Sequence, residues 1–259
     1  MKIDIKKKFP HLRKAPVVEA VIEFRARALS TWDETTTPPL LRAALPGYQK
    51  AENLFTVSLT LPFPVNPAAP PPGPPPAAKH SSDWAGLRLT SNDSTQVAAF
   101  KRDGLTFSRL PPYTRWSALT TEALRLWAIQ AEVSGATQIE RIGVRFINRL
   151  EVPTKGLKFG QYFNGLGTVP GGLPLSNFVS HRTIEIPDHP YTLILIQTIQ
   201  APPSPEATSL GLITDIDVVA LEPIVNDRGI ILRRLKEMRV LKNTLFFDSV
   251  TEKYLRLCR

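Results

Sequence analysis

Three arginines alternate with mostly apolar residues in the segment 141–150, and their guanidinium groups could bind anions. The arginines are Arg141, Arg145 and Arg149 in the sequence R-I-G-V-R-F-I-N-R-L. Because side chains of a strand point alternately to its two faces, the arginines share one face. A row of guanidinium groups needs anions nearby, either carboxylates of this chain or phosphates of a partner.

Carboxylates in two other expected strands could supply those anions. Glu19 and Glu23 share a face of the segment 16–28, and Asp215 and Asp217 share a face of the segment 210–221. Our main interpretation is a structural network of salt bridges that holds two parts of the chain together. The same residues could instead line a groove that holds phosphates, or a pocket for a small molecule or magnesium.

Basic residues also gather in two clusters outside these strands. One precedes the first strand and consists of Lys6, Lys7, Lys8, Arg13 and Lys14. The other lies on the expected last helix, beside the single acid Glu237, and consists of Arg228, Arg233, Arg234, Lys236, Arg239 and Lys242. A solvated helix face usually mixes both signs, so this excess favours an anionic partner. Few aromatic residues lie near the clusters, which predicts contact with phosphates rather than reading of bases.

The composition is that of a globular, basic chain. It has 259 residues, a net charge of +9 and 42% hydrophobic residues, which favours attraction to polyanions. Cys258 is the only cysteine, and the four histidines show no metal-binding spacing, so we expect no disulfide, metal, cofactor or catalytic residue. We also expect no membrane span and a cytoplasmic location, because there is no long apolar run and no signal-peptide core.

The periodicity predicts two similar halves. In residues 1–135 we expect a helix at 120–133, capped by Thr120, and strands at 16–28, 54–61, 87–90, 96–102 and 105–110. In residues 136–259 we expect a short helix at 157–163, a last helix at 229–243 capped by Asn226 or Asp227, and strands at 139–152, 178–186, 191–200 and 210–221. A proline-rich insertion covers 62–78. We therefore predict an α+β fold in which each half is an antiparallel meander closed by a helix, joined into one domain.

Three motifs resemble those of a sporadically distributed, uncharacterised prokaryotic protein family. They are A-P-V-V-E-A-V-I-E from residue 15, R-I-G-V-R-F-I-N-R from residue 141 and K-N-T-L-F-F-D-S-V-T from residue 242. The resemblance spans the whole chain, although Phe146 stands where tyrosine is most frequent in that family. The family implies no activity, but its patchy distribution is typical of defence systems or mobile elements.

These observations lead us to expect a non-enzymatic nucleic-acid-binding subunit. The two basic clusters would contact the phosphate backbone of RNA or DNA, within a prokaryotic assembly that includes a protein partner. One alternative is an enzyme that acts on a nucleotide or another anionic small molecule in a pocket of Glu, Arg and Asp residues. Another is a protein-binding partner or antitoxin. The oligomeric state is not predicted.

Overall fold

The computed structural model describes residues 2–60, 79–167, 171, 173, 175–201, 204 and 206–259. The proline-rich insertion expected at 62–78 lies outside the described residues.

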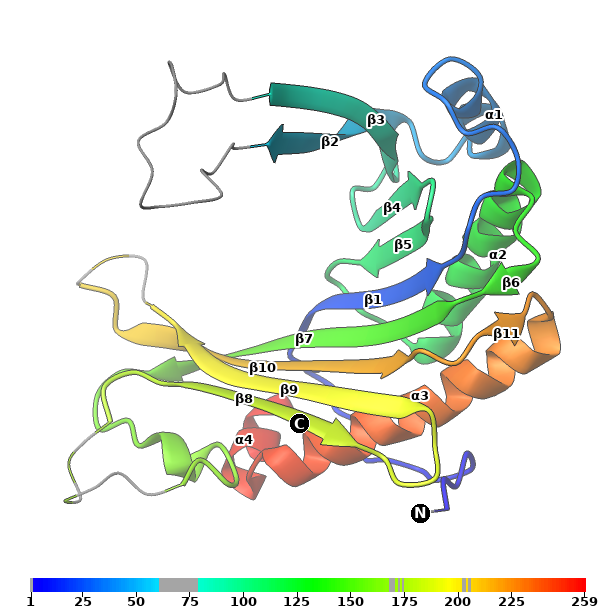
Figure 1. Ribbon diagram of the computed structural model, residues 1–259. Coiled ribbons are helices and arrows are strands. Elements are labelled where there is room, and N and C mark those ends of the chain that lie inside the picture. Colours follow the sequence, from blue (N-terminus) through cyan, green and yellow to red (C-terminus); the bar gives the residue numbers. More distant parts are fainter. Residues whose placement is uncertain are drawn as a thin grey trace, which may run out of the picture.

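A nine-stranded antiparallel sheet forms the centre of the molecule (Figure 1). Its strands lie in the order β2-β3-β4-β5-β1-β7-β10-β9-β8. Their bounds are β1 Val17–Arg25, β2 Lys50–Thr60, β3 Lys79–Thr90, β4 Gln96–Lys101, β5 Gly104–Arg109, β7 Arg141–Pro153, β8 Val179–Glu185, β9 Tyr191–Gln200 and β10 Ser209–Ala220. The short strands β6 (Gln138–Ile139) and β11 (Ile224–Val225) pair separately.

The two longest helices cover the same face of this sheet (Figure 1). Helix α2 (Trp116–Ser134) lies on β5 and β1, and α3 (Arg228–Ser249) lies on β10, β7 and β9. The core lies between these layers, where Phe24 of β1 packs on Trp127 at a ring distance of 5.1 Å. The opposite face carries Arg145, which is 46% exposed. The helices therefore leave this face of the central strands uncovered.

The strands on either side of the β1–β7 pair follow the same order. On one side β1 is followed by β5, β4 and β3, and on the other β7 is followed by β10, β9 and β8. The two opening strands meet in the middle, where Glu23 lies opposite Gly143.

The α+β class is confirmed. A common origin of the two halves stays a prediction.

Local sequence signals mark one end of each of the two long helices, and Asp227 was one of the two expected caps. Asp227 is the N-cap of α3, and its side chain accepts a hydrogen bond of 2.9 Å from the backbone N–H of Ile230. Gly135 ends α2 with a left-handed conformation, at a φ of 68°, which glycine adopts without steric strain.

Both predicted long helices exist, but their predicted bounds and one predicted cap were wrong. Helix α2 begins at Trp116, and Thr120 is not its cap, because the Thr120 hydroxyl donates to the Trp116 carbonyl at 3.0 Å. Helix α3 continues to Ser249, and the helix expected at 157–163 is a single 3-10 turn at Phe159–Gln161. The short helices α1 (Thr37–Ala44) and α4 (Glu252–Cys258) were not predicted.

The pair β2–β3 extends beyond the body of the sheet (Figure 1). Strand β3 pairs with β4 only from Gly86 to Thr90, so the outer part of the pair has no further strand beside it among the described residues. In this part Phe55 is 52% exposed and Val57 is 60% exposed.

Candidate functional site

The arginines of β7 are paired with neighbouring polar side chains on one face of the central strands. We call this surface the arginine face and define it by Glu19, Glu23, Arg141, Arg145, Arg149, Asp215 and Asp217. Arg141 forms an ion pair with Glu23 of β1. Arg145 binds Asp215 of β10 through Nε at 2.9 Å and 3.1 Å and through Nη2 at 2.5 Å. Arg149 donates from Nε to Oε1 of Gln200 at 2.7 Å.

All three guanidinium groups lean in the same direction along β7. Asp217 lies directly opposite Arg145, yet the guanidinium reaches Asp215, which lies opposite Ile147. Arg141 likewise reaches Glu23, which lies opposite Gly143, two residues further along β7. Such diagonal contacts are within reach of long side chains on adjacent strands.

Two glycines leave space for these pairs. A Cβ atom at Gly143 would lie 3.3 Å from Oε2 of Glu23 and 3.5 Å from Nη1 of Arg141. A Cβ atom at Gly211 of β10 would lie 2.8 Å from Nε of Arg149. The missing side chain of Gly143 therefore accommodates a neighbouring carboxylate.

The ion pairs differ in their electrostatics. The hydrogen bond to Asp215 raises the pKa of Arg145 above its ordinary value. The side chain of Asp215 is only 10% exposed, so this pair is half-buried. Burial raises the pKa of Asp217, and the opposing charges of Arg141 and Arg145 do not cancel this shift. The closest N–O distance between Asp217 and Arg141 is 3.9 Å. Asp215 is therefore the well-paired aspartate, and Asp217 is the poorly paired one.

A hollow of about 300 Å³ lies over the centre of the arginine face. Besides the charged residues, Thr106 and Ser108 of β5 line it. Three carboxylates and two guanidinium groups line the hollow, so it attracts cations more than phosphates. Among the described residues, no three His, Cys, Asp or Glu side chains lie where they could hold a metal ion together.

The N-terminal arm brings the first predicted basic cluster against the C-terminal part of α3, the helix that carries the second cluster. The N-terminal arm, residues 2–16, packs along α3 (Figure 1). Nζ of Lys7 donates to the hydroxyl of Thr244 at 3.1 Å, and the ring of Phe9 stacks on Phe247 at 5.7 Å. Further along the arm, the backbone N–H of Lys14 donates to the carbonyl of Cys258 in α4 at 2.9 Å. We call the arm together with the solvent-facing sides of α3 and α4 the arm–helix surface.

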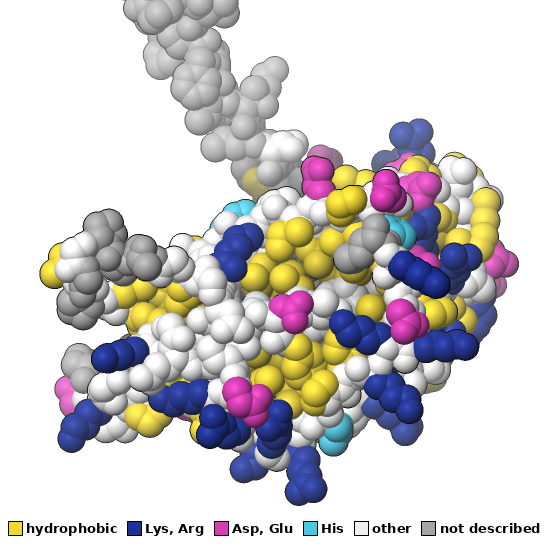
Figure 2. Space-filling model, turned by 90° about the horizontal axis from the view of Figure 1, so that it is seen from below, with side chains coloured by type: hydrophobic (Ala, Val, Ile, Leu, Met, Phe, Trp, Pro, Cys, Tyr) yellow, Lys and Arg dark blue, Asp and Glu magenta, His cyan; other side chains and the backbone are white. Residues whose placement is uncertain are grey.

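Most cations of the arm–helix surface point to solvent without an ion pair in the described part of the chain. In the view from below, Lys and Arg side chains lie around exposed apolar side chains, with a few Asp and Glu side chains among them (Figure 2). The exposed and unpaired members of the predicted clusters are Lys6, Lys7, Lys8, Arg13, Lys14, Arg228, Lys236 and Arg239. Arg233 pairs with Glu237 at 3.2 Å, and Arg234 pairs with Glu222.

Lys242 does not belong to the solvent-facing side of α3. It follows the buried residues Leu235 and Met238 along the helix and is itself partly buried, and its Nζ lies 3.8 Å from the ring centroid of Phe146. Burial lowers its pKa to about 7. Lys242 therefore affects the stability of the core and is not part of the ligand-binding surface.

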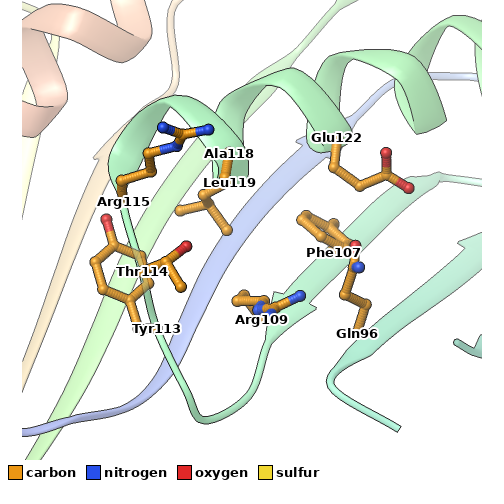
Figure 3. A pocket seen from close by; sticks show the side chains of 9 residues that line it. All are labelled: Gln96, Phe107, Arg109, Tyr113, Thr114, Arg115, Ala118, Leu119 and Glu122. Atoms are coloured by element: carbon orange, nitrogen blue, oxygen red, sulfur yellow. The ribbon is translucent and has the colours of Figure 1, made fainter. Parts of the chain in front are cut away.

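A further hollow with two arginines lies at the start of α2 (Figure 3). It measures about 260 Å³, and Arg109 enters it from β5 while Arg115 precedes the helix. Tyr113 lines the same hollow, and burial raises its pKa to about 12 against the opposing charge of Arg239. Nothing in the sequence pattern had indicated Arg109, Arg115 or the Phe9–Phe247 contact.

The chain matches no protein-family model, and no curated protein is detectably similar to it. The resemblance carried by the three motifs therefore stays a prediction. Within the described ranges, every helix is too short or too polar to span a membrane.

Proposed function

We propose that the protein is a non-enzymatic nucleic-acid-binding subunit that contacts the phosphate backbone through the arm–helix surface. The observation that carries this proposal is the separation of charges between two surfaces. On the arginine face the guanidinium groups are matched or outnumbered by carboxylates. The arm, α3 and α4 carry slightly more than half of the Lys and Arg residues that have no ion pair in the described chain, and the others are spread over the remaining elements. A phosphate backbone is the anion that fits such a surface, because unpaired cations release its counterions on binding.

The size of the surface suits a short stretch of nucleic acid. Helix α3 has 22 residues and is therefore about 33 Å long at 1.5 Å per residue. One strand of B-form DNA places a phosphate about every 3.4 Å, so roughly ten phosphates span that length. The exposed cations run from Arg228 at the start of α3 to Arg13 and Lys14 beside α4.

The wider role rests on the motif resemblance alone. It favours a defence-type or mobile-element assembly in a prokaryotic cytoplasm, in which this chain binds nucleic acid beside a protein partner. An enzyme that binds a nucleotide on the arginine face is the second candidate. The hollow of about 300 Å³ favours it, but the excess of carboxylates around that hollow does not.

The test is a titration of labelled oligonucleotides with the protein, followed by fluorescence anisotropy at several salt concentrations. We expect micromolar affinity at low salt. About six phosphate contacts should reduce the affinity by roughly a thousandfold between 50 mM and 200 mM salt. The combined variant Lys8→Gln, Lys236→Gln and Arg239→Gln should weaken binding and lower the slope of log affinity against log salt concentration.

Two matched controls remove a positive charge elsewhere. Arg88→Gln changes an arginine of β3 that pairs with Glu52, and it should leave binding unchanged. Arg145→Gln probes the arginine face. If Arg145→Gln abolished binding while the combined arm–helix variant bound normally, the site would lie on the sheet and the proposal would be wrong. An affinity that does not depend on salt would contradict it equally.

A further inference from the structure

We propose that the arm–helix surface prefers single-stranded nucleic acid, whose unpaired bases stack on the rings of Phe9 and Phe247. This inference rests on the nucleic-acid function proposed above and specifies its substrate class.

The two rings form an aromatic platform between segments that are far apart in the sequence. Their planes differ by 11° and their centroids lie 5.7 Å apart, so the rings are nearly parallel and offset. Phe246 meets Phe247 edge-on at 5.3 Å with an interplanar angle of 86°, which restricts the orientation of the Phe247 ring. Phe9 and Phe247 are both half-buried, so each ring keeps some surface in contact with solvent.

One cation, Lys7, lies directly on this platform, and two more flank it in the sequence. Nζ of Lys7 lies 5.2 Å from the centroid of Phe9 while it donates to Thr244. Lys6 and Lys8 are exposed and have no ion pair in the described chain. A base that stacks on Phe9 takes the position of the Lys7 ammonium, and that ammonium is then next to the phosphate of the stacked nucleotide. Aromatic rings within a basic groove are the chemistry with which proteins bind single strands without sequence preference.

The rings distinguish single strands from duplexes, whereas the cations do not. In a duplex each base face is covered by the next base pair, so only phosphates and base edges reach a protein surface. A single strand exposes base faces, and every base offers one to an aromatic ring. RNA and single-stranded DNA share this chemistry, and the assay compares them.

The experiment compares the binding of RNA, single-stranded DNA and duplex DNA of about twelve nucleotides or base pairs at low salt. We expect both single strands to bind more tightly than the duplex. Phe9→Leu and Phe247→Leu keep an apolar side chain but remove the ring. Each should weaken single-strand binding at least about fivefold, the equivalent of one stacked base at about 1 kcal/mol, and leave duplex binding unchanged.

Two variants serve as controls. Phe9→Tyr keeps an aromatic face and should bind single strands as the wild type does. Phe55→Leu makes the same chemical change at a ring that is 52% exposed on β2, and it should leave binding unchanged. A second readout needs no variant: a fluorescent adenine analogue in the single strand should lose emission when it stacks on the wild-type protein.

The outcomes separate this inference from the proposed function. Salt-sensitive binding that is equal for single strands and duplex, with no loss in the Phe9 and Phe247 variants and no loss of emission, would leave the phosphate-binding function intact and overturn the stacking platform. No binding of any oligonucleotide at low salt would overturn both. If a leucine variant fails to fold, the emission of the adenine analogue on the wild-type protein decides.

Discussion

Replacing Arg145 by alanine tests whether the arginine face supports the fold. The change removes a guanidinium that binds Asp215 at 2.9 Å, 3.1 Å and 2.5 Å, and it leaves the carboxylate in a site where its side chain is 10% exposed. Breaking a fully buried ion pair costs about 3–5 kcal/mol, and an exposed pair contributes about 0–1 kcal/mol. Because Arg145 is 46% exposed, we expect Arg145→Ala to lower the free energy of unfolding by about 2 kcal/mol.

Replacing the partner Asp215 by alanine should lower the free energy of unfolding by less. Asp215→Ala leaves a guanidinium that can turn to water or towards Asp217, so we expect a loss of about 1 kcal/mol. The double variant should resemble Asp215→Ala, because no unpaired carboxylate is then left at that site. A double-mutant cycle built on these free energies isolates the coupling of the pair.

Urea denaturation, followed by circular dichroism and tryptophan fluorescence, measures these differences. The comparison requires equal m-values for the wild type and all three variants. If Arg145→Ala unfolded at the wild-type urea concentration, Arg145 would not support the fold, and the arginine face would become the better candidate for a binding site.

Three further predictions concern stability. Burial raises the pKa of Asp217 above its unfolded value, so its ionised form lowers the stability of the protein at neutral pH. Asp217→Asn should therefore leave the free energy of unfolding unchanged or increase it, whereas Asp215→Asn should decrease it. Urea titrations at pH 7 measure both changes. Burial lowers the pKa of Lys242 from 10.5 to about 7, so its contribution to the free energy of unfolding should rise with pH between these values. Lys242→Met should therefore stabilise the protein at pH 7 by about 1 kcal/mol or more, and the gain should shrink towards pH 10. The gain should stay below roughly 5 kcal/mol, because contact with the Phe146 ring favours the ammonium. Deletion of residues 67–77 should leave the melting temperature unchanged, since loops tolerate changes in length, and a drop of many degrees would refute that.

Alternation of apolar and polar residues was enough to predict the class of the fold, because a half-buried strand must repeat every two residues. It could not provide the strand order, since the central contact joins β1 to β7 across more than a hundred residues of chain. The short helices α1 and α4 were missed because 8 and 7 residues contain too few turns for a helical period to stand out. Proline at the start of α1 also resembles a loop signal.

The sequence predicted that charged side chains meet on the arginine face, but it did not predict which residues form pairs. Shared faces of strands indicated that guanidinium groups and carboxylates would meet, and they do. The individual pairs depend on register and on side-chain length, so the partner of Arg145 is Asp215 and not the directly opposite Asp217. Lys242 offered a signal that was overlooked: it follows Leu235 and Met238 at the spacing of a buried stripe.

The arm–helix surface forms only when the chain folds, so the contact between Phe9 and Phe247 was not predicted from the sequence. Phe9 lies beside lysines near the start of the chain, and Phe247 lies near its end. Neither segment alone suggests more than phosphate contact. The arm is held against α3 and α4 at Thr244, Phe247 and Cys258, and these contacts combine the rings with both basic clusters. If the arm can be released from α3, the platform is lost while most cations remain. Truncation of the arm before Phe9 would retain both rings, whereas truncation after it would remove one. The two truncations therefore separate the effect of charge from the effect of stacking, provided that both proteins melt as the full chain does.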